Sequence, residues 1–283
     1  MFKKFVALIL CFMLTVCFSS CGKDKTEKKT ERSEVKKEAK TVKEFVWTDY
    51  PEVESEDYNI ASQPAYRDLN YYESQIAAFE AQPVEEGKIL FYGASNFTRW
   101  SMDWGNPSLE SALQSSTGER VCVNHGFGGA TLHEMCYYYE RAVKPWKPKV
   151  FVTSLSANGG EFYSTTQMMQ YIQWLCSHVR KDFPGIKIFV SGSAPHLVDD
   201  ASNIEWRKKL NTMLAAYAEV HDDVTYIDLA HERMYYMDDE SAQNGTFTDL
   251  NRAIYADDGK HLNAEGYKRY AEVFKKYLAD YLV

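Results

Sequence analysis

Serine, histidine and aspartate side chains that could perform nucleophilic catalysis stand at two distant places in the chain. Ser95 follows a short apolar run, while Asp258 and His261 are three residues apart near the C-terminal end. One tight turn can bring the Asp258 carboxylate onto the His261 imidazole, which can then take a proton from a serine hydroxyl. This pattern predicts attack of Ser95 on an acyl carbon, with His261 as base and Asp258 stabilising the imidazolium.

Two glycine-containing turns contain candidate donors for a developing oxyanion. Residues 126–131 read Gly-Phe-Gly-Gly-Ala-Thr, and residues 156–160 read Ser-Ala-Asn-Gly-Gly. Glycines let backbone amides face a ligand without interference from a Cβ atom. We expect the oxyanion hole to combine Ser95, the Gly129 N–H and the Asn158 side chain, each donor contributing roughly 3–4 kcal/mol. The order Gly-x-Gly-Gly lacks the third, spaced glycine of a dinucleotide-binding loop.

Strand and helix patterns alternate along the chain and must position these groups. Apolar runs predict strands over 88–92, 120–123, 149–155, 186–191 and 224–229, and helical spacing predicts helices over 66–81, 107–116, 131–143, 165–182, 203–221 and 264–282. Such alternation requires a parallel sheet with helices on both faces, an α/β fold of three layers. Ligands bind beyond the carboxyl ends of such strands, so the five candidate residues can converge there.

Each candidate residue also has a structural interpretation. Ser95 or Asn96 could cap the next helix, Asn158 could cap its loop, and His261 could be a surface histidine beside acids. Three further residues are candidates for substrate binding: Asn96, Trp100 and His196. A tryptophan such as Trp100 can stack on a sugar, although most such residues pack in the core. For His125 and His196 the sequence favours a structural role.

Four sequence blocks resemble the SGNH (GDSL-type) hydrolase superfamily over about residues 66–283. The blocks are Phe91-Tyr92-Gly93-Ala94-Ser95, Asn124-His125-Gly126-Phe127-Gly128-Gly129, Ser156-Ala157-Asn158-Gly159 and Asp258-Gly259-Lys260-His261. They follow the order of the family's blocks, each at the expected end of a strand. The resemblance implies a flavodoxin-like five-stranded parallel sheet and an acylhydrolase of the lipoprotein-anchored acetylesterase branch.

The second residue of the first block and two residues of the third depart from the family pattern. Ala94 and Gly159 each replace an aspartate, and Ser156 replaces a glycine. In the family these aspartates organise the loops and are not the nucleophile, the base or the oxyanion donors. We therefore expect an active enzyme whose loops are looser or shaped for an unusual substrate.

The N-terminal residues predict export and membrane anchoring. A basic start, an apolar stretch from 5 to 18 and small residues before Cys21 indicate a secretory signal over 1–20. Phe18-Ser19-Ser20-Cys21 resembles a bacterial lipobox, which implies lipidation of Cys21 and a position on the cell exterior. The alternative is an ordinary cleaved signal with an incidental cysteine. Residues 21–44 are a charged flexible tether, and 45–283 form the hydrolase domain, with a strap and a helix over 45–87.

Charge and cysteine content restrict the partners. The chain carries 32 Lys+Arg and 40 Asp+Glu, and removing the 11 basic and 6 acidic residues before position 45 leaves a domain of net charge −13. This surface argues against nucleic acid and fits a neutral substrate. Cys122, Cys136 and Cys176 could form one disulfide but more often pack as small hydrophobes. The sequence suggests neither a metal site nor a cofactor.

The sequence therefore predicts a serine esterase that hydrolyses a short, acetyl-type acyl ester, with a carbohydrate as one possible alcohol. A second enzyme hypothesis is a lysophospholipase or thioesterase, which a long apolar groove would favour. The alternative outside enzymology is a non-catalytic lipoprotein that binds a glycan, for which the substitutions Ala94 and Gly159 are the support.

Overall fold

The computed structural model describes residues 58–283. The predictions for the signal peptide, Cys21, the tether and the first part of the strap lie outside the described residues.

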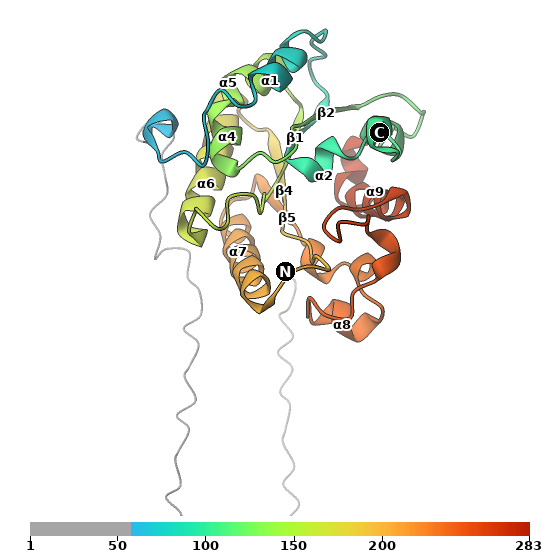
Figure 1. Cartoon of the computed structure of the whole chain (residues 1–283). Coiled ribbons are helices and arrows are strands. Elements are labelled where there is room, and N and C mark those ends of the chain that lie inside the picture. The colour runs from blue at the N-terminus through green and yellow to red at the C-terminus, as the bar shows by residue number, and fades with distance from the viewer. Residues whose placement is uncertain (1–57) are drawn as a thin grey trace, which may run out of the picture. The chain divides into compact units, whose positions relative to one another are not determined.

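A parallel sheet of five strands forms the centre of the domain (Figure 1). The strands are β1 (Ile89–Gly93), β2 (Cys122–Gly126), β3 (Val150–Ser154), β4 (Lys187–Ser191) and β5 (Val224–Ile227). Their order is β2-β1-β3-β4-β5, and every neighbouring pair is parallel. Both faces of β1 are buried, as expected for a strand covered by helices on each side. The predicted flavodoxin-like α/β fold is confirmed.

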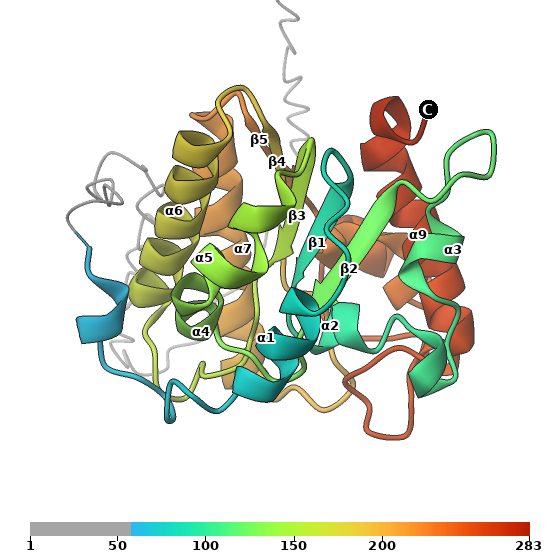
Figure 2. The ribbon, with the colours of Figure 1, turned by 90° about the horizontal axis from the view of Figure 1, so that it is seen from above.

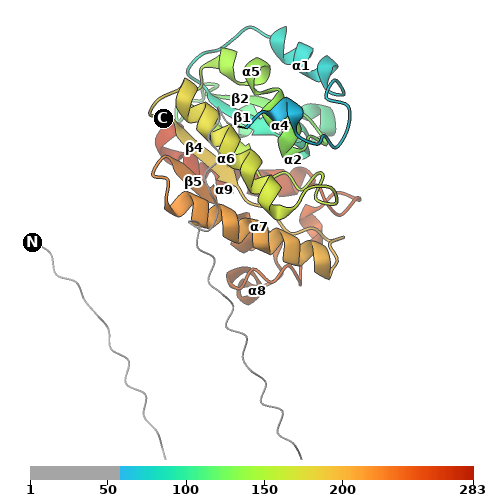
Figure 3. The same ribbon diagram turned by 90° about the vertical axis from the view of Figure 1, so that its left-hand side faces the viewer.

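Helices cover the two faces of the sheet in separate layers (Figure 2). One layer contains α1 (Glu73–Glu80), α4 (Leu132–Tyr137), α5 (Tyr139–Ala142), α6 (Thr165–Asp182) and α7 (Ala201–Glu219); the other contains α2 (Ser95–Thr98), α3 (Leu109–Ala112), α8 (Asp239–Gln243) and α9 (Ala264–Leu278). Helices α6 and α7 lie side by side along the first layer (Figure 3). Each layer packs on the sheet through its own hydrophobic core.

Three predicted helices differ clearly from the structure. The helix expected over 107–116 is limited to Leu109–Ala112. The helix expected over 66–81 begins only at Glu73, because Tyr66 and Tyr72 are hydrogen-bonded to distant loops, which holds residues 66–72 in an irregular conformation. The helix expected over 131–143 is interrupted at Tyr138, whose φ of −91° and ψ of 3° end α4. The start of α4 agrees with the sequence, since Thr131 and Glu134 form a capping box.

Residues 58–72, here called the N-terminal segment, cross the helices of the first layer. The carbonyl of Tyr58 accepts a hydrogen bond from the Trp174 indole N–H, and the carbonyl of Pro64 accepts one from Tyr163. The segment thus reaches both α6 and the loop that precedes it.

The three cysteines of the domain are free and buried, as the sequence favoured. Burial raises the pKa of the Cys122 thiol to about 12, which keeps it protonated. His125 is also a core residue: it is fully buried, stacks on Phe79 and is hydrogen-bonded to the Ala142 carbonyl. No helix within residues 58–283 has both the length and the apolarity needed to cross a membrane.

Candidate active site

Ser95 stands at the carboxyl end of the sheet, directly after β1. The strand ends at Gly93, where a Cβ atom would lie 2.7 Å from the Phe97 ring, and Ala94 then precedes helix α2. Ser95 is the first residue of α2, so its N–H has no helical partner. The N-cap of α2 is Ala94, with no side-chain cap, so the interpretation of Ser95 or Asn96 as a cap is wrong.

Asp258, His261 and Ser95 form one continuous hydrogen-bonded relay. The Asp258 Oδ2 atom lies 2.7 Å from His261 Nδ1, and His261 Nε2 lies 2.9 Å from Ser95 Oγ. The other carboxylate oxygen accepts the N–H groups of Lys260 and His261, at 3.0 and 2.9 Å. This local turn holds the carboxylate within hydrogen-bond distance of the imidazole Nδ1. His261 is therefore not an isolated surface histidine.

Arg99 joins the relay, although the sequence did not single it out as a site residue. Its Nη1 atom lies 2.9 Å from Asp258 Oδ2, the same oxygen that meets His261. The guanidinium also lies over the Trp104 ring, 4.5 Å from the centroid, which holds it in place. The signal that could have identified Arg99 is its spacing: it follows Ser95 by four residues, one helical turn away.

The environment prepares the relay for proton transfer. Burial raises the pKa of Asp258, but the N–H groups of His261 and Lys260 and the His261 ring stabilise the carboxylate more strongly, so the net pKa lies well below its ordinary value. Burial lowers the pKa of His261, the hydrogen bond to Asp258 opposes this, and the Arg99 charge lowers the pKa further. The net pKa of His261 is below its ordinary value, so a neutral imidazole faces Ser95 at pH 7.

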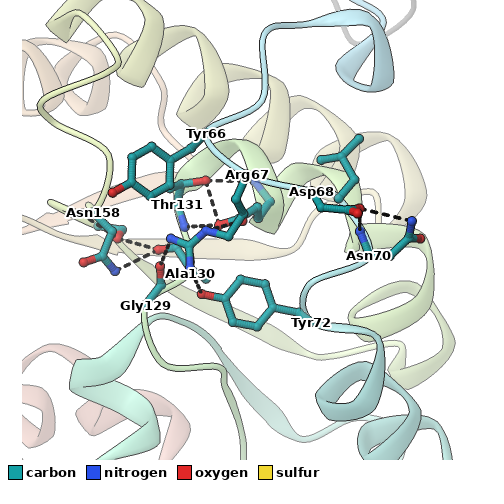
Figure 4. Close-up of polar contacts among 12 residues, drawn as sticks. Tyr66, Arg67, Asp68, Asn70, Tyr72, Gly129, Ala130, Thr131 and Asn158 are labelled. Atoms are coloured by element: carbon teal, nitrogen blue, oxygen red, sulfur yellow. Dashed lines mark hydrogen bonds and ion pairs between the residues drawn. The ribbon is translucent and has the colours of Figure 1, made fainter.

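Asn158 and Gly129 lie in two neighbouring loops, and the loop of Asn158 is hydrogen-bonded to a backbone carbonyl in the loop of Gly129 (Figure 4). The Ala130 oxygen accepts the Asn158 side-chain amide at 3.0 Å and the Ser156 hydroxyl at 2.7 Å. The Ser156 hydroxyl also accepts the Asn158 N–H. Gly129 has a φ of +83°, a conformation that favours glycine, and its N–H has no hydrogen-bond partner within residues 58–283.

The departures from the family pattern fit the local packing. Gly159 has a φ of +78°, and a Cβ atom there would lie 3.0 Å from both Thr131 and Tyr163. An aspartate would be strained at this position, and Ser156 instead anchors the Asn158 loop. Ala94 is almost fully buried, with 5% of its surface exposed, so it leaves a small apolar side chain at the entrance of α2.

Two cavities adjoin each other beside Asn158 and His196, and the smaller one reaches Ser95 and His261. A small one, of about 80 Å³, is lined by Ala94, Ser95, Asn96, Ser154, Leu155, Ser156, Ala157, Asn158, Ser193, Ala194, His196, Arg207, Lys260 and His261. A larger one, of about 380 Å³, is lined by Tyr66, Arg67, Gly129, Ala157, Asn158, Gly159, Glu161, His196, Val198, Asp199, Asn203, Arg207 and Lys260. Five residues, Asn158 among them, line both cavities. Gly129 lines only the larger one.

His196 lines both cavities and is held by a buried ion pair. Its Nδ1 atom accepts a hydrogen bond of 2.9 Å from Arg207 Nη2, and Arg207 is paired with Asp199 at 2.9 Å. Burial, followed by the Arg207 charge, holds the pKa of His196 well below its ordinary value. The neutral ring therefore carries its proton on Nε2 and can donate a hydrogen bond. His196 thus lies in the lining of both cavities, and its role in substrate binding stays a prediction.

Trp100 does not belong to the site. Its side chain is fully buried and packs against Tyr267, Tyr270 and Phe274 of α9. The prediction that Trp100 binds substrate is therefore wrong. The Trp100 indole points away from the cavity and packs the end of α2 against α9. Asn96 does line the small cavity, while its backbone carbonyl accepts the Tyr267 hydroxyl.

Comparison with known proteins agrees with this arrangement of β1, the two glycine loops and the Asp-His turn. Residues 91–269 match the model of the GDSL-like lipase/acylhydrolase family. The chain belongs to this family. It is thus a member of the SGNH (GDSL-type) superfamily and a hydrolase that acts on ester bonds. None of the curated proteins compared with the chain matches it.

Solved structures share the fold at low sequence identity. A Bacteroides fragilis protein described as an acylhydrolase has a TM-score of 0.56 at 18% identity, covering 78% of this chain and 100% of that one. A GDSL-like lipase from Bacteroides thetaiotaomicron has a TM-score of 0.54 at 17% identity, covering 75% and 98%. An acetyl xylan esterase has a TM-score of 0.52 at 16% identity, covering 68% and 99%.

No group of His, Cys, Asp or Glu side chains in the described part of the chain could hold a metal ion.

Proposed function

We propose that the chain is a serine esterase that removes a short, acetyl-type acyl group from a polar alcohol, with Ser95, His261 and Asp258 as its catalytic residues. The observation that carries this proposal is the relay of 2.7 and 2.9 Å at the edge of a cavity of about 80 Å³.

The reaction proceeds through an acyl-enzyme. His261 Nε2 takes the proton of Ser95 as its Oγ attacks the ester carbonyl, and Asp258 stabilises the imidazolium that forms. The N–H groups of Ser95 and Gly129 and the free amide hydrogen of Asn158 stabilise the oxyanion. His261 then gives its proton to the departing alkoxide. A water molecule, deprotonated by His261, releases the acyl group by the reverse sequence.

The size of the small cavity supports a short acyl group. Its volume of about 80 Å³ has room for only a few water-sized groups. Such a space admits an acetyl group, whereas the tail of a lipid or of a long-chain thioester would have to leave the cavity. The long apolar groove that would favour a lysophospholipase is not a feature of the small cavity at Ser95 or of the larger cavity that adjoins it.

The larger cavity supports a polar alcohol. Its lining combines the Tyr66 ring with the side chains of Glu161, Asn203 and Lys260. Carboxylate, amide and ammonium groups beside an aromatic ring are suited to the hydroxyl groups and apolar faces of a carbohydrate. The acetyl xylan esterase of similar fold acts, by its name, on such an ester, which adds support for this substrate class.

We further propose that a lipid on Cys21 holds this domain on the outer side of a membrane. The lipobox-like residues 18–21 and the charged residues that follow support this location.

Hydrolysis of p-nitrophenyl esters by the purified full-length chain tests the activity. We expect kcat/KM to fall at least 10-fold from the acetate to the octanoate, and Ser95→Ala to abolish both turnover and labelling by a fluorophosphonate. Equal rates with acetate and octanoate would favour the lysophospholipase or thioesterase hypothesis. Absence of turnover and of labelling in the wild type would favour the glycan-binding hypothesis.

A panel of acetylated oligosaccharides then identifies the alcohol. Acetate release from one member at a kcat/KM well above that of p-nitrophenyl acetate would support the carbohydrate assignment, and no release from any member would contradict it.

A further inference from the structure

The loop that contains Gly129 is held by side chains of the N-terminal segment, which lies outside the residues matched by the family model (Figure 4). Tyr72 donates a hydrogen bond of 3.1 Å to the Gly128 carbonyl, and Arg67 donates one of 3.1 Å to the Gly129 carbonyl. Two successive peptide groups of the loop are therefore fixed by residues that precede the sheet in sequence.

The contact of Tyr72 determines where the Gly129 N–H is directed. The Gly128 carbonyl and the Gly129 N–H belong to the same peptide group, and in a trans peptide these two groups lie on opposite sides. A hydroxyl that holds the carbonyl on one side thus directs the N–H to the other. Because glycine permits several backbone conformations, this peptide could rotate without such a contact.

The Arg67 guanidinium determines that the Tyr72 hydroxyl is the donor in its hydrogen bond to the Gly128 carbonyl. Arg67 Nη1 lies 3.2 Å from the Tyr72 hydroxyl and can only donate, so the hydroxyl proton is left for the Gly128 carbonyl. Burial raises the pKa of Tyr72 well above its ordinary value, so the hydroxyl remains a donor at every working pH.

Arg67 is itself anchored to the start of α4. Its Nε atom lies 3.0 Å from Glu134, whose side chain is only 1% exposed, and the same carboxylate accepts the Thr131 N–H. The rings of Tyr66 and Tyr71 flank the guanidinium at 4.8 and 4.9 Å. Arg67 thus forms an ion pair with a buried carboxylate, and its guanidinium is held in place by contacts on several sides.

We infer that Tyr72, oriented by Arg67, is a positioning residue that directs the Gly129 N–H toward the oxyanion. This inference rests on the proposed serine esterase activity. The role is indirect: Tyr72 acts through the Gly128–Gly129 peptide and does not touch the reacting atoms.

The variant Tyr72→Phe tests the inference because it removes only the hydroxyl. The ring packs edge to face on Phe127 at 5.1 Å and keeps that contact, so the fold should be retained. We expect kcat for p-nitrophenyl acetate to fall about 10–50-fold, part of the ~10²–10³-fold loss seen when an oxyanion donor is removed. KM should stay within twofold, and the midpoint of the acid limb of the pH profile, set by His261, should not move.

Tyr138→Phe is the matched control. Tyr138 is also buried and donates its hydroxyl to the N-terminal segment, at the Leu69 carbonyl. Only its ring contacts the glycine loop, edge to face on Phe127 at 6.3 Å, and phenylalanine keeps that contact. We expect its kcat within twofold of the wild type. An equal loss of kcat in both variants, or a loss accompanied by a matching rise in KM, would overturn the positioning role.

A second variant covers the case in which Tyr72→Phe does not fold. Arg67→Lys keeps a cation for Glu134 but cannot also reach Tyr72 and the Gly129 carbonyl, and we expect kcat to fall about 3–10-fold. Wild-type kcat in both variants, alongside an inactive Ser95→Ala, would refute the inference and leave the esterase proposal intact. An inactive, unlabelled wild type would overturn both.

Discussion

The side-chain amide of Asn158 gives the sharpest test of the oxyanion hole. One of its two amide hydrogens is used by the Ala130 carbonyl at 3.0 Å, which fixes the side chain. The second hydrogen is then free to meet the oxyanion. Asn158→Ala removes this donor and leaves the relay of Ser95 and His261 untouched.

The effects of this change on activity and on stability differ in size. Loss of one oxyanion donor costs about 3–4 kcal/mol of transition-state stabilisation, which corresponds to a fall of roughly 10²–10³ in kcat. Loss of the hydrogen bond to Ala130 lowers the free energy of unfolding by only about 1 kcal/mol, because the Ser156 hydroxyl still reaches that carbonyl at 2.7 Å. Activity should therefore collapse while the fold is retained.

Steady-state hydrolysis of p-nitrophenyl acetate, together with urea unfolding, measures both quantities. Asn244→Ala is the matched control, since Asn244 is an exposed asparagine that lines neither of the two cavities at the site. Its kcat for this small substrate should remain within twofold of the wild type. If Asn158→Ala keeps kcat within threefold of the wild type while its stability is unchanged, Asn158 is not an oxyanion donor and the assignment of the third block is refuted.

Three further predictions follow from the site and its supports. Because the pKa of His261 lies below its ordinary value of 6.5, kcat/KM should reach half its maximum below pH 6.5. Arg99→Gln removes a cation that disfavours the imidazolium, so a pH–rate profile should show this midpoint raised. Trp100→Ala should lower the free energy of unfolding by about 3–5 kcal/mol in urea titrations, whereas a substrate-binding Trp100 would change KM at constant stability. Cys21→Ala should move the protein from the membrane fraction to the soluble fraction on cell fractionation, and retention in the membrane would contradict lipidation.

Local sequence patterns were sufficient for the sheet and for much of the site. Strands β1 and β3 are short, largely apolar runs that are buried on both faces, and such burial leaves these runs few alternatives. The Asp258–His261 pair could also be predicted, because a spacing of three residues makes this contact independent of the rest of the fold.

Contacts between distant segments could not be read from local patterns. Apolar spacing continues from Tyr66 to Ala81, yet Arg67 and Tyr72 bond to the glycine loop more than fifty residues away, and helix α1 starts only after them. The burial of Trp100 could not be predicted either, because it depends on packing against α9, which lies far away in sequence.

The sequence by itself determined the order of the elements, the residue types of the relay and the glycine that a φ of +83° requires. Those properties are local, because they depend on spacing, on apolar runs and on the conformational freedom of single residues. Only the tertiary structure decided that Arg99 shares Asp258 with His261, that Trp100 faces the core, and that the N-terminal segment holds the Gly129 loop. Those properties depend on which distant surfaces pack together, and spacing along the chain does not identify the partner that each residue meets.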